Sequence, residues 1–268
     1  MSKGRTRTAP VEIAGTAMVT GGTSGIGLAF ARALAERGCD LILVARNRQR
    51  LDQTAEELRQ GHDIAVHTVV ADLTDHADVD MVARRLEDET APVDILVNNA
   101  GNGIHTPLTA TDMSVHEVAL DVMVRAVLLL GGAAGRAMQK RGSGIIINVG
   151  SVAGLVAMGS YSAIKSWVNT YSESLSLELE GAGVQVMTLI PGWVRTEFHQ
   201  RASIRTSTIP RFLWLDARRL VEDCLRDVEA GRTRSVPSRR FKMITWGAQR
   251  LPRALVRRAT ASIRKGRS

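Results

Sequence analysis

The stretch that most constrains the fold is a glycine-rich turn between a strand pattern and a helical pattern. Residues 16–20 (TAMVT) form a short apolar run, the turn GGTSGIG follows at residues 21–27, and a helical pattern continues to Gly38. In such a layout the amide groups and the dipole of the helix N-terminus meet an anion, and glycine lets the backbone approach it closely. The spacing is GxxxGxG, which differs from the GxGxxG of the general dinucleotide motif. Glycines in a tight turn are often only structural, but the strand before and the helix after favour a phosphate-binding turn.

Strand and helix patterns alternate along most of the chain. Further apolar strand patterns occur at residues 40–45, 64–71, 93–97, 144–149 and 184–190, with helical patterns between them, including a long one over 112–140. This alternation predicts an α/β fold, a Rossmann-type doubly wound parallel sheet with flanking helices. In a chain of 268 residues we expect one dinucleotide-binding catalytic domain over 1–230, with a substrate lid at about 193–215, and a basic C-terminal helical extension over 231–268.

Small and polar residues lie at the carboxyl ends of these predicted strands, where open α/β sheets bind their ligands. They are the turn at 21–27, Arg46, Asp72, the tetrapeptide NNAG at 98–101, Ser151 and Pro191. The second strand is followed by Arg46, and no acidic residue is present there to bind the 2′-hydroxyl of NAD. An arginine at this point suits the 2′-phosphate of NADP, so NADP is the favoured cofactor. A solvated arginine at the start of a helix is the alternative.

A tyrosine and a lysine provide candidate acid/base chemistry. Tyr161 and Lys165 are four residues apart, which on a helix places both side chains on one face, with Cβ atoms about 5–6 Å apart. A nearby ammonium favours the phenolate and lowers the pKa of a phenol from its usual value near 10. Ser151, ten residues ahead of the tyrosine, could bind the same substrate oxygen. The three side chains would then exchange a proton with a carbonyl/alcohol pair.

The motifs TGxxxGxG from Thr20, NNAG from Asn98, Ser151, YxxxK from Tyr161 and PG from Pro191 together resemble the short-chain dehydrogenase/reductase family, over about residues 14–200. The resemblance implies that Tyr161 is the catalytic acid/base and that Ser151 orients and polarises the substrate oxygen. It implies that Lys165 lowers the tyrosine pKa and, with Tyr161, contacts the nicotinamide ribose. The other implied cofactor contacts are Gly21, Thr23, Ser24, Gly25, Ile26 and Gly27 at the pyrophosphate, Asp72 and Leu73 at the adenine, Asn98, Ala100 and Gly101 beside the ribose, and Pro191, Gly192, Val194 and Thr196 at the nicotinamide.

The chain departs from the family pattern at two points. The family commonly has about thirteen residues between the serine and the tyrosine, so the loop between Ser151 and Tyr161 should be shorter here. The family also usually has an asparagine in the long helix that holds a water of the proton relay, and the matching position here is Met123. The complete Ser/Tyr/Lys set still predicts hydride transfer. A non-catalytic NADP-binding regulatory protein on the same fold is the alternative that Met123 favours.

The predicted substrate side is rich in aromatic residues. Trp193, Phe198, Phe212 and Trp214 lie in or beside the expected lid. They would suit an apolar substrate with an acyl chain, a lipid-like body or a steroid-like ring system, although packing of the lid onto the sheet would give the same pattern. The stretch from Trp193 (WVRTEFHQRA) and the VP pair at 236–237 before a basic C-terminus resemble the branch with ketoacyl and long-chain ketone reductases. His105 and His199 have no partners at ligand spacing, so no metal is expected.

The positive charge of the chain is concentrated in its C-terminal extension. Residues 231–268 hold 12 of the 35 Lys and Arg and none of the 27 Asp and Glu, which leaves 23 basic against 27 acidic residues before them. The stretch 241–268 also carries apolar residues such as Trp246, so it would lie on the inner membrane face or pack as a solvated helix. No motif accompanies the charge, so nucleic acid is not expected as a partner.

Several sequence features favour a cytoplasmic compartment. Cys39 and Cys224 have neither CxxC nor metal spacing, as is typical of a reducing environment. We find no signal-peptide pattern near the start and no uncharged apolar run approaching 18 residues. We therefore expect a cytoplasmic enzyme, with peripheral membrane contact through 241–268 as a further hypothesis. A small carbonyl or alcohol substrate and a homo-oligomer, either a dimer or a tetramer, complete the expected partners.

Overall fold

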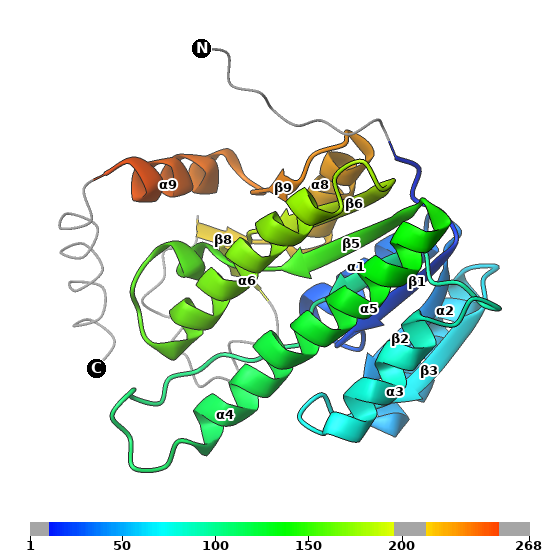
Figure 1. Cartoon of the computed structure of the whole chain (residues 1–268), viewed down its shortest axis with the longest axis horizontal. Helices are drawn as coiled ribbons and strands as arrows, with labels where there is room; N and C mark the ends of the chain where they lie inside the picture. The colour runs from blue at the N-terminus through cyan, green and yellow to red at the C-terminus, as the bar shows by residue number, and fades with distance from the viewer. Residues whose placement is uncertain (1–10, 196–212, 252–268) are drawn as a thin grey trace.

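The computed structural model describes residues 11–195 and 213–251, and a seven-stranded parallel sheet forms its centre (Figure 1). The strand order is β3-β2-β1-β4-β5-β6-β9. The strands are β1 Thr16–Thr20, β2 Asp40–Ala45, β3 Val66–Val70, β4 Ile95–Asn98, β5 Gly144–Val149, β6 Val184–Leu189 and β9 Arg234–Ser235. The order reverses direction between β1 and β4, so the predicted doubly wound Rossmann-type sheet is confirmed.

Helices cover both faces of this sheet (Figure 1). The α-helices of the described residues are α1 Gly25–Ala35, α2 Arg48–Gly61, α3 His76–Leu86, α4 Ser114–Leu120, α5 Ala126–Arg141, α6 Ser160–Glu178, α8 Ala217–Glu229 and α9 Arg239–Arg250. A short 3₁₀ turn, Val152–Leu155, follows β5, and a second, two-stranded sheet pairs β7 (Trp193–Val194) with β8 (Trp214–Leu215).

The alternation of side chains along the strands creates one core on each face of the sheet. In β1, Ala17 and Val19 join the core formed with α1, α2 and α8, where Phe30 is fully buried. Met18, between them, points to the other face and joins the core formed with α3, α5 and α6, where Leu130 is fully buried. Successive residues of a strand face opposite sides, so a central strand with both faces covered reads as a continuous apolar run.

The long helix expected over 112–140 is interrupted. It runs as α4, then a π-helical turn at Asp121–Arg125, then α5. Met123 lies in the π turn and is fully buried. By length and composition Ser114–Arg141 is apolar enough to cross a membrane, but half of its most apolar window is buried inside the fold, so the chain uses it as a core helix. Single π-helical turns inside α-helices are frequently found at functional sites.

The segments around the predicted lid are anchored to the main fold at both ends. β7 precedes residues 196–212 and β8 follows them, so the two strands pair across that segment. The lid itself, with Thr196, Phe198, His199 and Phe212, lies outside the described residues. β9 then joins the main sheet beside β6. The domain boundary predicted after residue 230, which falls just ahead of β9, stays a prediction.

Candidate active site

The side chains predicted to be catalytic converge at the carboxyl end of β5. Ser151 follows this strand, and Tyr161 and Lys165 lie in the first turns of α6. The Nζ atom of Lys165 lies 5.9 Å from the centroid of the Tyr161 ring, which confirms that the helical spacing places both on one face. Lys165 is only 6% exposed, and its Nζ donates a 2.7 Å hydrogen bond to the carbonyl oxygen of Val149 in β5.

Burial dominates the electrostatics of this pair. Desolvation raises the pKa of Tyr161 to about 12, although a hydrogen bond with Ser151 opposes the rise. Desolvation also lowers the pKa of Lys165 to about 8. The predicted lowering of the tyrosine pKa by the lysine is therefore wrong for these residues taken alone. The physical reason is that burial penalises both charged forms, while the ammonium is directed at the Val149 carbonyl.

Ser151 is oriented by its own backbone turn. Its Oγ accepts a 3.0 Å hydrogen bond from the amide of Ala153, at the start of the 3₁₀ turn. The hydroxyl proton is therefore available to donate, and the hydrogen bond with Tyr161 lowers the pKa of that phenol relative to burial alone. The 3₁₀ turn occupies much of the short connection to α6, so ten residues suffice to bring serine and tyrosine together.

Asn169 is a residue that the sequence reasoning missed. It lies one further turn along the same helical face as Tyr161 and Lys165, and its Nδ2 donates a 3.2 Å hydrogen bond to the carbonyl of Ser151. A Cβ added at Gly150 would lie 2.0 Å from its Oδ1, and one added at Gly154 would lie 2.6 Å from its Nδ2. The two glycines thus let the serine loop lie directly on α6. The spacing of four residues from Lys165 is the signal that could have identified it.

A buried polar network supports the site from below. The Nδ2 of Asn98 donates to the Oδ1 of Asn148 (2.9 Å), and the Nδ2 of Asn148 donates to the Oγ of Ser172 (3.0 Å). Asn98, predicted to flank the ribose, thus directs its amide into the fold and joins β4 to β5, where it pairs in register with Asn148. Asn148 and Ser172 were not predicted. A polar residue inside the apolar run GIIINV was the available signal for Asn148.

The glycine turn has the geometry of an anion cradle. Gly21 and Gly25 have φ values of 66° and 56°, and a Cβ at Gly27 would lie 2.2 Å from the carbonyl oxygen of Gly21. The Nδ2 of Asn99, the second residue of the NNAG tetrapeptide, holds this turn through a 2.9 Å hydrogen bond to the carbonyl of Thr20. Ser24 is the N-cap of α1, but its side chain caps no amide. The uncapped N-terminus of α1 therefore fits a pyrophosphate.

The predicted adenosine side brings Arg46 and Asp72 together. An Arg46 Nη1 atom lies 3.7 Å from Asp72 Oδ2, and the arginine side chain is 72% exposed. Burial would raise the pKa of Asp72, but hydrogen bonds from the Thr74 amide and hydroxyl, and then Arg46, lower it overall. Leu73 and Thr23, predicted to contact the adenine and the pyrophosphate, are both buried. An exposed ion pair of this length is weak, so the guanidinium can bind a phosphate.

The surroundings of Met123 are apolar. It packs with Ala119 and Ile164, and Ile104 and the Tyr161 ring lie against this cluster. A Cβ at Gly101 would lie 2.8 Å from its Sδ atom. The position predicted to match the relay asparagine of the family is therefore occupied by an apolar side chain, packed in a cluster that the Tyr161 ring also contacts.

On the nicotinamide side, the predicted residues are held by short strands and by α9. Val194 is buried in β7, and Ala100 and Gly101 follow β4 at the same sheet edge. Ile26, which was predicted at the pyrophosphate, is partly buried against the core formed with α1, α2 and α8. Pro191 accepts a 3.0 Å hydrogen bond at its carbonyl from the Val152 amide, and Gly192 lies directly against the ring of Phe241. Among the described residues, no group of three or more His, Cys, Asp or Glu could hold a metal.

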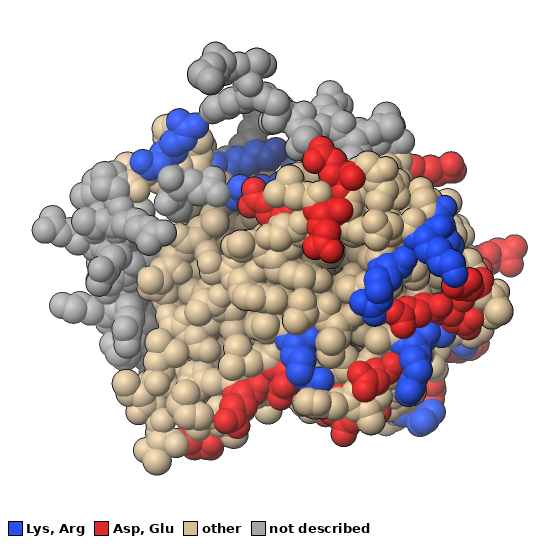
Figure 2. Space-filling model, in the orientation of Figure 1, with Lys and Arg blue, Asp and Glu red and all other residues tan. Residues whose placement is uncertain are grey.

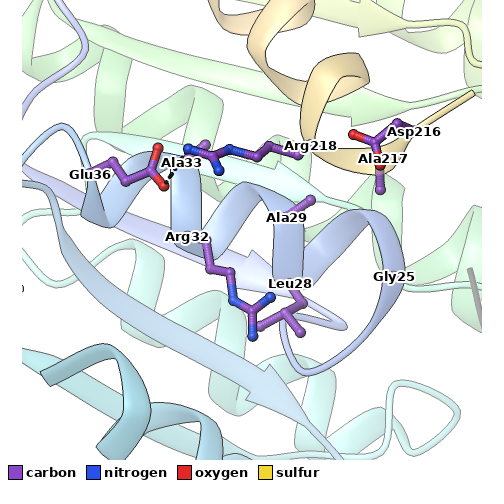
Figure 3. Close-up of a pocket in the computed structure, with 9 residues that line it drawn as sticks. All are labelled: Gly25, Leu28, Ala29, Arg32, Ala33, Glu36, Asp216, Ala217 and Arg218. Atoms are coloured by element: carbon purple, nitrogen blue, oxygen red, sulfur yellow. Dashed lines mark hydrogen bonds and ion pairs between the residues drawn. The ribbon is translucent and has the colours of Figure 1, made fainter. Parts of the chain in front are cut away.

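A groove of about 290 Å³ lies between α1 and the start of α8, and none of Ser151, Tyr161 and Lys165 lines it (Figure 3). Arg218 spans it to Glu36, with an Nη2–Oε1 distance of 3.2 Å, and Arg32 and Asp216 also line it. Gly25 is the one residue that it shares with the glycine turn described above.

The sheet, the anion cradle and the Ser/Tyr/Lys set at its carboxyl edge define a nucleotide-dependent oxidoreductase. The chain belongs to the short-chain dehydrogenase family, because the model described as short chain dehydrogenase matches residues 15–206. It is an oxidoreductase that interconverts alcohol and carbonyl groups, as its relatives do.

Relatives of known activity and structure agree with this assignment. Galactitol 2-dehydrogenase (L-tagatose-forming) of Cereibacter sphaeroides is 39% identical over 206 residues, which cover 75% of this chain and 78% of that protein. A short-chain dehydrogenase from Sphingobium yanoikuyae in complex with NADPH has a TM-score of 0.80 at 33% identity, covering 87% and 93% of the two chains. The bulky-bulky ketone specific alcohol dehydrogenase from Comamonas testosteroni has a TM-score of 0.74 at 30% identity, covering 87% and 92%.

Proposed function

We propose that the protein catalyses the NADP-dependent reduction of a bulky apolar ketone to a secondary alcohol, or the reverse reaction. The observation that carries the proposal is the hydrogen-bonded Ser151–Tyr161 pair, with Lys165 beneath it, at the sheet edge that also presents the uncapped N-terminus of α1. No comparison supports the non-catalytic alternative, and the catalytic set is complete.

The residues divide the chemistry between them. Bound nicotinamide supplies or accepts the hydride. Tyr161 has a pKa of about 12 and thus holds its proton at neutral pH, as an acid must when it protonates a developing alkoxide. Ser151 donates a second hydrogen bond to the same oxygen and fixes its position. Lys165, with a pKa of about 8, remains largely protonated at pH 7 and places a positive charge beneath the tyrosine when the phenolate forms.

NADP is proposed over NAD because of Arg46. Its exposed guanidinium lies at the end of β2, where the 2′-substituent of the adenosine ribose is recognised in this fold. No acidic residue follows β2 directly to bind a free 2′-hydroxyl. The bound NADPH in the structure from Sphingobium yanoikuyae is consistent with this preference.

The substrate class is proposed from the residues around the site. Trp193 and Trp214 pair in β7 and β8, on either side of the predicted lid in the sequence. Val152, Trp193 and Leu215 pack against one buried apolar cluster. The ketone specificity of the relative from Comamonas testosteroni supports a bulky apolar substrate. The relative from Cereibacter sphaeroides favours a polyol instead, so a sugar alcohol is the second candidate.

One substrate panel separates these proposals. Purified protein is mixed with NADPH and acyl-chain, aromatic and steroidal ketones, and with NADP and galactitol, and the change in nicotinamide absorbance is followed. Turnover of the ketones with at least tenfold higher kcat/KM than galactitol supports the apolar class. Turnover of galactitol alone would replace it with the polyol class. Tight NADPH binding without turnover of any compound would favour the non-catalytic regulator.

We also propose a cytoplasmic homo-oligomer. Val118 and Leu120 of α4 and Leu128 and Leu129 of α5 are all exposed. In Figure 2 they belong to helices that form a broad face almost without charged side chains. Exposed apolar patches of this kind usually mark interfaces. Two copies of this uncharged face could pack together without bringing like charges close to each other. Light scattering on the wild type and on Leu128→Glu tests this, since a purely monomeric wild type would contradict it.

Peripheral contact with the anionic inner membrane face is proposed for α9 and the residues after it. Met243 and Trp246 are 75% and 62% exposed, while Arg240, Lys242 and Arg250 are exposed beside them without any acidic residue in the helix. Basic residues near an anionic surface contribute about 1 kcal/mol each, and the apolar side chains add burial at the interface. Sedimentation with anionic and neutral vesicles tests this. Equal sedimentation of wild type and Trp246→Glu would show that the helix is only a packed cap.

A further inference from the structure

The inner side of α9 is anchored next to the active site by one aromatic side chain. Phe241 is 1% exposed and packs with Ile190 and Val236, and its ring centroid lies 6.1 Å from that of Trp193, tilted by 56°. A Cβ added at Gly192 would lie 2.1 Å from the Cζ atom of Phe241. The ring therefore lies flush against the Pro191–Gly192 backbone, in space that any side chain at position 192 would need.

That backbone is connected directly to the catalytic serine. The carbonyl of Pro191 accepts a 3.0 Å hydrogen bond from the amide of Val152, the residue after Ser151. The amide of Gly150, the residue before Ser151, donates a 2.8 Å hydrogen bond to the carbonyl of Leu189. The segment 189–192 thus holds the serine loop from both sides, and α9 also contacts the 3₁₀ turn that follows Ser151.

The backbone just ahead of α9 has an unusual conformation. Ser238 has a φ of 87°, and it is the one non-glycine residue with positive φ in the part of the chain that the structure describes. Its carbonyl accepts a 3.0 Å hydrogen bond from the Lys242 amide, which begins the helix. Residues in such conformations persist where the surrounding structure fixes them, and Phe241, three residues later, is buried in the fold.

We propose that Phe241 is a positioning residue for catalysis, acting through Gly192 and Pro191 on the loop that carries Ser151 and on the predicted nicotinamide contacts. The inference rests on the proposed carbonyl reduction for its kinetic readout. Displacements of about 1 Å in such a loop can reduce turnover by roughly a hundredfold, so a contact with no substrate atom can still control the rate. The glycine at 192 is then required by the ring of Phe241 as well as by the cofactor.

The test is a double-mutant cycle between the two positions in the full-length protein. We expect Phe241→Ala and Gly192→Ala each to lower kcat/KM at least tenfold and to weaken NADPH binding, measured by nucleotide fluorescence. The double variant should recover part of both losses, because removing the ring opens the space that the new methyl group needs. Leu225→Ala is the matched control, since Leu225 is fully buried in α8 on the core with α1. It should lower the melting temperature but leave kcat/KM within about twofold.

A purely structural role for Phe241 would give a different pattern. Phe241→Ala would then lose thermal stability like Leu225→Ala but keep its kcat/KM and NADPH affinity below the melting temperature. That outcome overturns the proposal. If Phe241→Ala does not fold, Phe241→Leu is compared in its place. The NADPH affinities of the variants can be measured even if the wild type reduces no ketone. The role of Phe241 can therefore be judged even if the proposed function fails.

Discussion

The ammonium of Lys165 donates a 2.7 Å hydrogen bond to the carbonyl of Val149, two residues before Ser151. This bond joins α6, which carries Tyr161, to the end of the strand that delivers the serine. Lys165 therefore fixes the relative position of Ser151 and Tyr161, the two groups proposed to bind the substrate oxygen, besides placing its charge beneath the phenol.

Tyr161→Phe should abolish turnover while leaving NADPH affinity within a few-fold. The ring still packs against Met123 and Ile164, but the proton is absent. General acid catalysis is typically worth 10²–10⁴ in rate, so kcat should fall at least about a hundredfold. Steady-state kinetics and fluorescence titration with NADPH measure the two effects. Turnover above about a hundredth of the wild-type value would rule out the proposed role.

Arg46→Asp should reverse the cofactor preference. The new carboxylate would repel the 2′-phosphate of NADPH and accept a hydrogen bond from the ribose of NADH. The ratio of kcat/KM values with the two cofactors is the measurement, and Arg32→Ala, an exposed arginine on α1, is a matched control. An unchanged ratio would mean that another residue binds the phosphate, with Arg48 as the next candidate.

Lys165→Met should remove a rise in stability with pH. The pKa of Lys165 is about 8 in the folded protein and near 10.5 when unfolded, so between these values the unfolded chain binds more protons. The free energy of unfolding therefore increases with pH in this window, by on the order of 3 kcal/mol in total. Above about pH 10 the raised pKa of Tyr161 acts in the opposite direction. Chemical denaturation of wild type and variant at pH 7.5 to 10 gives the difference; parallel curves would disprove the lowered pKa.

Met123→Asn should destabilise the protein. The amide would replace a fully buried thioether among Ala119, Ile164 and the tyrosine ring, where the described neighbours are apolar. An unpaired buried polar group costs about 1–3 kcal/mol, which should appear as a lower denaturation midpoint. Met123→Leu, which keeps the site apolar, should cost less than about 1.5 kcal/mol. Equal stability of wild type and Met123→Asn would show that water or another polar partner reaches this position.

Much of the site could be predicted because it depends on local order along the chain. The run at 16–20 and the turn at 21–27 predicted a strand, a phosphate-binding turn and a helix, and the spacing of Tyr161 and Lys165 predicted a shared face. Parallel strands bring their carboxyl ends to one edge, so the convergence of Arg46, Asp72 and Ser151 also followed from alternation alone.

The tertiary structure decided what depends on burial and on contacts between distant segments. Burial raises the pKa of Tyr161 and lowers that of Lys165, which helical spacing cannot show because it contains no measure of solvent access. The break of the long helix at Met123, the amide of Asn98 turned toward Asn148, and the hydrogen bond from Asn169 to the Ser151 carbonyl each depend on what packs opposite. The contact of Phe241 with Gly192 joins residues 49 positions apart, so only the folded chain reveals it.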